Sequence, residues 1–258
     1  MKSYIFFYKF AMIINVLLVM AKKHHIFLLF CLILTCFLNA QETKRHSISA
    51  DFMALGVAGY SNTYKWYGGA DLKCCLHVDN TDISVNLEAL TPKTFSMGLT
   101  VSPSFQVCRN GYVFVDGTLH SRIFAQYKSY EFVYAGSAGF KMRHFLVQVG
   151  VFSKTIDALG REWHSLDNYV TEPFNVLYKL TVSIMGFDNN WDVYLTGSNF
   201  NDYEYERVRE PICSLGGRWD FKDKWSAVAE GTLQAAGMFH GTVKFYEAVM
   251  RIGVRYKL

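Results

Sequence analysis

Two histidine–serine pairs have the residue types needed for covalent catalysis, because a serine hydroxyl becomes a nucleophile only beside a base. His120 precedes Ser121, and His164 precedes Ser165 within the stretch EWHSLDN. Neighbouring strand residues point to opposite faces, so His120 and Ser121 cannot pair in a regular strand. His164 and Ser165 fall in a stretch of free geometry, but no nucleophile motif surrounds them. They are weak catalytic candidates beside the simpler interpretation of a hydrated loop, and the sequence favours a protein that is not an enzyme.

A second cluster, NFNDYEYERVRE at residues 199–210, interleaves tyrosines with acids and two arginines. Such a run could bind a cation, a sugar or a partner protein, whereas the simpler interpretation is a solvated loop. The contact residues that it predicts are Asp202, Tyr203, Glu204, Tyr205 and Glu206.

The cysteines give little support for a metal site or a disulfide. Cys74 and Cys75 are adjacent and point to opposite faces of a strand, and no CxxC motif is present. His77 shares a face with Cys75, but we identify nothing nearby that supplies the remaining ligands of a zinc site. Cys108 and Cys213 fall near opposite ends of their predicted strands. We therefore expect no metal, no cofactor and no disulfide.

The net charge excludes one large class of function. The formal charge is +4, but residues 1–40 hold four lysines and no acid, so the remainder has equal numbers of basic and acidic residues. Binding to phosphate backbones needs a basic surplus on one face. The composition therefore argues against a nucleic-acid partner.

The first forty residues have the pattern of an export signal. Residues 20–40 combine a basic start, an apolar run and Asn39-Ala40, which is the layout of a signal peptide. Residues 1–19 are then an over-extended start or an extra leader, although an anchor over residues 3–19, interrupted by Lys9, is the competing interpretation. Residues 41–258 form the single mature domain.

Apolar and polar residues alternate along the whole mature domain, which is the pattern of half-buried strands. We find no convincing amphipathic helix of about ten residues or more in this part of the sequence. The predicted strands cover residues 46–60, 65–78, 82–90, 93–107, 111–126, 129–141, 144–153, 173–187, 191–198, 211–222, 225–236 and 241–258. The fold class is therefore all-β, with twelve strands as the best count within a range of 10–14.

The connections sort by length along the chain. Every second connection is a tight Asn-, Asp- or Arg-containing turn, whereas the others include the long stretches 154–172 and 199–210. Short turns at one end and long loops at the other are typical of a transmembrane up-and-down antiparallel β-barrel, and an even strand number brings both termini to the short-turn end.

The carboxyl-terminal stretch YEAVMRIGVRYKL alternates up to the last residue. An unpaired edge strand is costly in lipid, so we expect this strand to pair with the first one. At this point the chain resembles the outer-membrane β-barrels of Gram-negative bacteria, a porin-like group whose terminal strand is recognised by the barrel-assembly machinery. The departure is the last residue, which is usually Phe in that family. The residues that match the assembly signal are Met250, Ile252, Val254, Tyr256 and Leu258.

The polar faces of the predicted strands carry both signs of charge. The lumen-facing set is Glu88, Arg122, Glu131, Lys141, Lys179, Arg218, Asp220, Glu230, Glu247, Arg251 and Arg255. A barrel of about twelve strands has a modest lumen. These side chains therefore either line a narrow polar pore or fill the interior as satisfied ion pairs, and the mixed signs favour filling.

The function that follows is an outer-membrane barrel that is structural or a narrow passive channel, with surface-exposed loops. One alternative is a barrel-embedded lipid hydrolase, and another is an adhesin-like or partner-binding component of an envelope complex. The resemblance implies outer-membrane lipid, lipopolysaccharide and the assembly machinery as partners, and the outer membrane as the location.

Overall fold

The computed structural model describes residues 47–124, 129–158, 170–187, 189–208, 210–236 and 244–258. The predicted leader segments, residues 1–19 and 20–40, lie outside these ranges and remain predictions. Across the ranges described, no helix is long and apolar enough to cross a membrane.

Twelve strands account for most of the described chain, as the alternation predicts. They are β1 Ile48–Ser61, β2 Lys65–Val78, β3 Thr81–Thr91, β4 Thr94–Cys108, β5 Gly111–Phe124, β6 Ser129–Met142, β7 Phe145–Ala158, β8 Val170–Ser183, β9 Trp191–Ser198, β10 Ile212–Lys222, β11 Trp225–Ala236 and β12 Lys244–Lys257.

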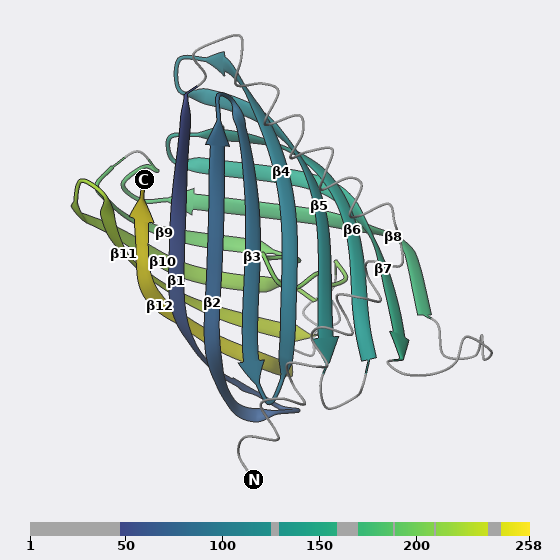
Figure 1. The fold of residues 1–258 in the computed structure, drawn as a ribbon. Coiled ribbons are helices and arrows are strands. Elements are labelled where there is room, and N and C mark those ends of the chain that lie inside the picture. The colour runs from purple at the N-terminus through teal and green to yellow at the C-terminus, as the bar shows by residue number, and fades with distance from the viewer. Residues whose placement is uncertain (1–46, 125–128, 159–169, 188, 209, 237–243) are drawn as a thin grey trace. The chain divides into compact units, whose positions relative to one another are not determined.

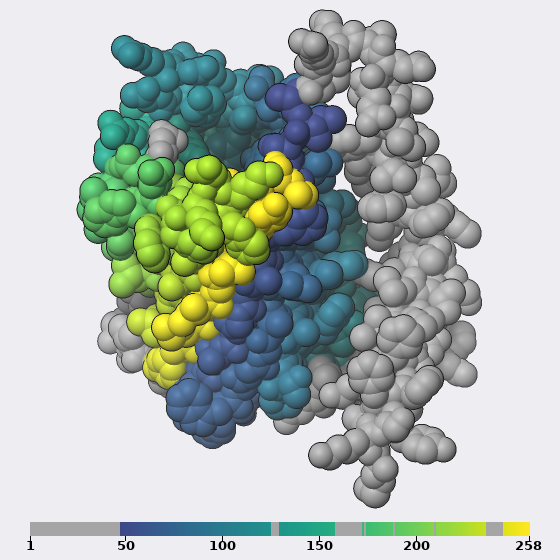
Figure 2. Space-filling model, turned by 60° about the vertical axis from the view of Figure 1, so that its left-hand side comes forward, coloured from purple at the N-terminus to yellow at the C-terminus, as the bar shows by residue number. Residues whose placement is uncertain are grey.

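The strands form one closed antiparallel barrel in which each strand pairs with its sequence neighbours (Figure 1). The ring closes between β1 and β12, whose register runs from Asp51 opposite Lys257 to Ser61 opposite Glu247. Figure 2 shows this seam, with β12 in yellow lying along β1 in purple. The amide of Leu258 donates to the carbonyl of Ala50 over 2.8 Å, so the final residue belongs to the wall.

The two faces of the wall differ in polarity, because successive side chains of a strand point to opposite sides. On β12, Met250 and Ile252 point outward and are each 53% exposed, whereas Glu247 and Arg251 point inward and are buried. The outside is an apolar surface and the inside is polar. This is the inverse of a soluble protein and suits a wall that lipid surrounds.

The two ends of the barrel also differ. The turns at the end with the chain termini are short, as between β2 and β3 or between β10 and β11. Trp191, Trp219 and Trp225 are exposed on the outer surface near this end, where an interfacial aromatic girdle is expected. We call this the periplasmic end and the opposite one the outer end.

Strand ends near the outer loops differ from the prediction. β7 runs to Ala158 and β8 begins at Val170, so the predicted loop 154–172 is shorter. Lys154 falls in the predicted loop, but in the structure it points into the lumen and pairs with Glu131 at 3.1 Å. Polar residues buried in a lumen look like loop residues in a sequence.

Candidate functional site

The loop between β9 and β10 folds into the barrel interior. Residues 199–206, the inner hairpin, are closed by a bridge between Phe200 and Tyr205. The side-chain oxygen of Asn201 accepts the amides of Tyr203 and Glu204, each over 2.8 Å. An Asn side chain that binds nearby backbone amides stabilises a tight turn, so the local sequence itself favours this hairpin.

Asn199 fixes the hairpin to the wall. Its side chain is fully buried, donates to the carbonyls of Val176 and Glu206, and accepts the amide of Tyr178 over 2.9 Å. The side chain of Asn199 therefore bonds backbone groups of β8 that lie beyond the end of β9, and the loop turns inward at this point.

The acids of the hairpin pair with cations on the opposite wall. Asp202 contacts Lys73 of β2 at 2.6 Å. Glu204 contacts Lys93, in the β3–β4 turn, at 3.2 Å and Arg122 of β5 at 3.1 Å. In a ring of twelve strands, β3 and β4 lie opposite β9 and β10, so the hairpin spans the lumen.

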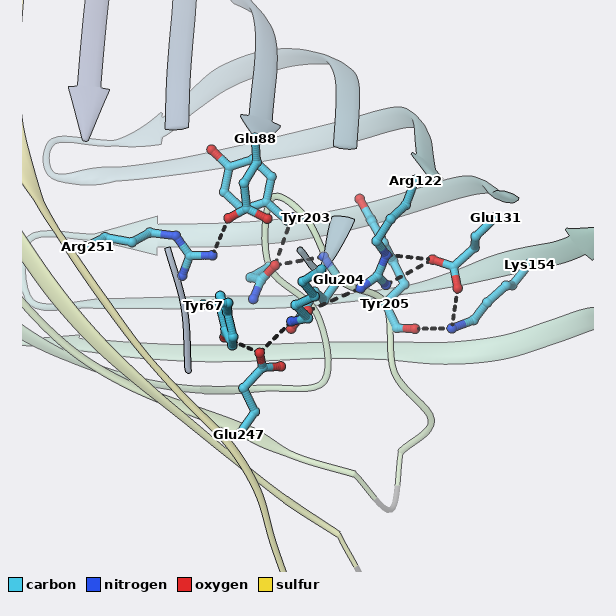
Figure 3. A network of polar contacts seen from close by, with 12 residues as sticks. Tyr67, Glu88, Arg122, Glu131, Lys154, Tyr203, Glu204, Tyr205, Glu247 and Arg251 are labelled. Carbon is cyan, nitrogen blue, oxygen red and sulfur yellow. Dashed lines mark hydrogen bonds and ion pairs between the residues drawn. The ribbon is translucent and has the colours of Figure 1, made fainter. Parts of the chain in front are cut away.

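Glu204 belongs to a network of buried ion pairs, which Figure 3 shows from close by. Arg122 also pairs with Glu131 at 2.9 Å, and Glu131 pairs with Lys154 at 3.1 Å. Lys154 donates to the carbonyl of Tyr205 over 2.8 Å. The hairpin backbone and its carboxylates are therefore both held by wall cations.

A second branch of the network reaches β12. Lys93 contacts Glu247 at 2.5 Å, and the hydroxyl of Tyr67 donates to the same carboxylate. The ammonium of Lys93 also lies 4.9 Å from the centre of the Tyr67 ring. Lys93 thus contacts two carboxylates and the face of an aromatic ring. These contacts compensate for the burial of its charge, although it lies in a turn.

Tyr203 is held by a third group. Its hydroxyl donates to Asp71, and the guanidinium of Arg251 lies 5.1 Å from the ring centre. Arg251 pairs with Glu88 at 2.7 Å. Tyr203 is 4% exposed, so this aromatic side chain is enclosed by charged groups of three strands.

Tyr205 packs at the apolar centre of the hairpin. Its ring lies 5.7 Å from Phe152, 5.9 Å from Phe200 and 5.6 Å from His120, measured between centroids. The hairpin is therefore fixed by apolar contact as well as by charge.

The hairpin carboxyls titrate differently from one another. Burial alone would raise the pKa of Asp202, but Lys73 and Lys179 outweigh burial and lower the pKa to about 2. Burial is likewise outweighed at Glu204, where Lys93 and Arg122 lower the pKa to about 2. Burial raises the pKa of Glu206 to about 7, despite the nearby cations.

The structure places all eleven predicted lumen charges on the inward face of their strands, where each contacts a polar, charged or aromatic partner. Arg218 donates to the carbonyls of Phe187 and Asn189, and Asp220 contacts Arg218 and Lys257. Glu230 accepts the hydroxyl of Tyr194 over 3.0 Å. The rest of the set consists of Lys141 over the Phe187 ring, Lys179 over the Phe200 ring, Arg255 paired with Asp51, and the network residues above.

The prediction that residues 202–206 form an outer contact surface is wrong. Tyr203 and Tyr205 are buried, while Asp202 and Glu204 are bound to wall cations inside the barrel. An acidic, tyrosine-rich run resembles a solvated loop in the sequence, because its counter-charges come from strands distant in the chain. Lys73, Lys93 and Asp71 were missed for the same reason.

The catalytic candidates find no support among the described residues. His164 and Ser165 lie outside the described ranges. His120 is buried against Tyr205 inside the lumen, and Ser121 points the other way. Within the part of the chain that the structure describes, no histidine nitrogen is bonded to a serine hydroxyl.

The four cysteines of the barrel, Cys74, Cys75, Cys108 and Cys213, are free. The expectation that nothing near Cys75 and His77 could complete a metal site is wrong. Asp82 lies 2.7 Å from His77, because the β2–β3 register places these two residues opposite each other.

Solved structures with the same fold are outer-membrane proteins. The translocator domain of the autotransporter NalP from Neisseria meningitidis has a TM-score of 0.51 at 12% identity, covering 84% of this chain and 91% of that one. The KdgM porin, in a complex with disordered oligogalacturonate, has a TM-score of 0.50 at 9% identity, covering 81% and 98%. The NanC porin has a TM-score of 0.48 at 14% identity, covering 80% and 100%. No protein-family model matches the sequence, and no curated protein does.

At these identities the likeness concerns the fold alone. The chain has the fold of an outer-membrane β-barrel, with the apolar outer surface and hydrogen-bonded closure that lipid requires. The outer membrane of a Gram-negative bacterium is where such barrels reside, which agrees with the location predicted from the sequence.

Proposed function

We propose that the protein is a narrow passive channel for small polar solutes, restricted at its outer end by the inner hairpin. The observation that supports this most strongly is the crossing of the lumen: a hairpin that begins at β9 pairs through Asp202 and Glu204 with β2, the β3–β4 turn and β5. A loop that only filled space would not need ion pairs to strands on the opposite side of the lumen.

The charges around the hairpin favour small solutes of either sign. Cations such as Lys179 and Arg218 and acids such as Asp116 and Glu230 share the lumen wall. No single sign of charge dominates the described interior, so the wall offers little basis for strong anion or cation selection.

Assembly of the barrel is proposed to depend on the terminal strand. Met250, Ile252, Val254 and Leu258 point outward and are at least 42% exposed, and the Tyr256 ring packs on Trp225. An exposed apolar row on the strand that closes the barrel is the feature that the barrel-assembly machinery would read. The surrounding partners are then outer-membrane lipid and lipopolysaccharide.

Single-channel recording in planar bilayers tests the channel function. We compare wild type with a variant in which residues 200–206 are replaced by a short Gly-Ser linker. Wild type should show small, infrequent openings. The variant should show a steady conductance several-fold larger, because the inner hairpin no longer crosses the lumen.

The control is Arg207→Ala, which removes an exposed ion pair with Glu172 at the rim and should leave conductance unchanged. A linker variant that stays silent, although folded, would refute the channel and support a purely structural barrel.

A further inference from the structure

We propose that Cys75, His77 and Asp82 form a Zn²⁺-binding site inside the lumen at the periplasmic end of the barrel. The three side chains come from the hairpin of β2 and β3, and the atoms that could bind metal all lie within 4.8 Å of one another. This site lies outside the inner hairpin and does not depend on the proposed channel function.

The register of the hairpin brings these residues together. Cys75 and His77 are two positions apart on β2 and therefore share the inward face. Asp82 is paired directly with His77 across the β2–β3 ladder. Side chains of directly paired residues are close neighbours on one face of a sheet, so three ligand types converge without any loop.

The distances fit a metal after a small adjustment. Cys75 Sγ lies 3.9 Å from His77 Nδ1, and Asp82 Oδ1 lies 2.7 Å from the same nitrogen. Ligand atoms of a tetrahedral zinc are about 3.4 to 3.6 Å apart, because zinc bonds to N, O and S measure about 2.0 to 2.3 Å. Shifts of under about 1 Å, within the reach of side-chain rotation, would therefore suffice.

The other nitrogen of His77 is already oriented for this role. His77 Nε2 lies 3.0 Å from Asp51 Oδ2, and Asp51 is itself held by Arg255. With Nε2–H donating to Asp51, loss of the proton that Nδ1 shares with Asp82 leaves on Nδ1 the lone pair that a metal needs. This carboxylate–histidine arrangement is the usual outer support of histidine ligands in zinc sites.

The charges of the three ligands and their exposure to the lumen also suit a Zn²⁺ ion. A Zn²⁺ ion would be balanced by the Cys75 thiolate and the Asp82 carboxylate. The thiol proton, and the proton between His77 Nδ1 and Asp82, would be released to solvent. Asp51 is balanced separately by Arg255. The side chain of Asp82 is 56% exposed and that of His77 is 29% exposed, so an ion can enter from the periplasmic mouth and water can fill a fourth position.

Cys74 provides a matched control because it is adjacent to Cys75 but points to the lipid face. The purified full chain, without a polyhistidine tag, is titrated with Zn²⁺ by calorimetry and with Co²⁺ by absorbance. Wild type and Cys74→Ser should bind one ion and show the thiolate-to-cobalt charge-transfer band. Cys75→Ser should lose that band and bind Zn²⁺ at least about tenfold more weakly.

Asp51→Asn should weaken binding by about 10- to 100-fold while keeping the band, since it removes the carboxylate that supports His77 and pairs with Arg255 but no metal ligand. Retention of the barrel by each variant is verified by its heat-modifiable migration in gels. As a second readout, Zn²⁺ should slow the reaction of Cys75 with a water-soluble maleimide in the Cys74→Ser protein. Equal binding by Cys75→Ser and wild type, or loss of binding in Cys74→Ser, would overturn the site.

Discussion

Arg122 is the residue on which the interior network depends most, since it pairs with both Glu131 and Glu204. Its side chain is 6% exposed, so the two carboxylates have little water to replace it. Breaking a buried ion pair on one side typically costs about 3 to 5 kcal/mol, much more than an exposed pair.

We therefore expect Arg122→Met to lower the free energy of unfolding by about 3 kcal/mol. Urea unfolding in detergent micelles, followed by tryptophan fluorescence, measures this. The double variant Arg122→Met/Glu131→Gln should recover part of the loss, because it removes one of the carboxylates left short of a partner. A loss no larger than that of Arg207→Ala would show that the network contributes little.

The shifted pKa values of the hairpin carboxyls predict how docking of the inner hairpin to the barrel wall depends on pH. Asp202 and Glu204 have lowered pKa values, so their contribution to docking is complete above about pH 4.5 and is lost progressively as the pH falls from there to about 2. Glu206 has a pKa raised to about 7, so its ionisation opposes docking as the pH rises. Docking should therefore weaken as the pH rises from about 4.5 to about 7 and change little above that.

Open probability in single-channel recordings should rise over that range in wild type. Glu206→Gln should abolish the rise, since a neutral amide cannot ionise, and Glu210→Gln in the same loop should retain it. A wild-type channel whose gating is flat from about pH 4.5 to about pH 7 would contradict the assignment to Glu206.

At the scale of elements, the seam between β1 and β12 depends on a close approach of two backbones. A Cβ placed on Gly253 would lie 2.0 Å from the carbonyl oxygen of Ala54 and 2.7 Å from the Cα of Leu55. Neither atom belongs to a flexible side chain, so the strands themselves must separate.

Gly253→Ala should therefore reduce the yield of heat-resistant folded barrel several-fold. Gly231→Ala on β11 is the control, because its added Cβ meets only the carbonyl oxygen of Leu215 at 4.0 Å. Equal yields from the two variants, measured by gel migration of unheated samples, would show that the seam tolerates the added atom.

Strands and their facing could be predicted because lipid and lumen impose opposite polarity on alternate residues. The inward direction of the loop between β9 and β10 could not be predicted. The acids of residues 202–206 pair with cations on β2, β5 and the β3–β4 turn, which are distant in the chain. The cluster around His77 lies between these cases. The predicted turn at residues 79–81 would pair Asp82 with Val78, whereas the observed turn is one residue shorter and pairs Asp82 with His77.

For the whole molecule, the structure describes a barrel whose lumen is crossed by its own inner hairpin and whose periplasmic end holds a separate polar cluster. Ion pairs of the inner hairpin join opposite walls, so the interior stiffens the ring as well as narrowing it. The apolar outer surface suits the outer membrane, and in the proposed channel the inner hairpin would limit which solutes pass.

Amide hydrogen exchange of the protein in detergent or bilayers tests the central claim, that residues 199–206 lie inside the lumen. The amide of Asn201 is bonded to the carbonyl of Glu204, and the amide of Glu206 to that of Asn199. These amides should exchange far more slowly than those of an open surface loop and approach the protection of the strands. Complete exchange of residues 199–206 at the earliest time point, with the strands still protected, would contradict the account.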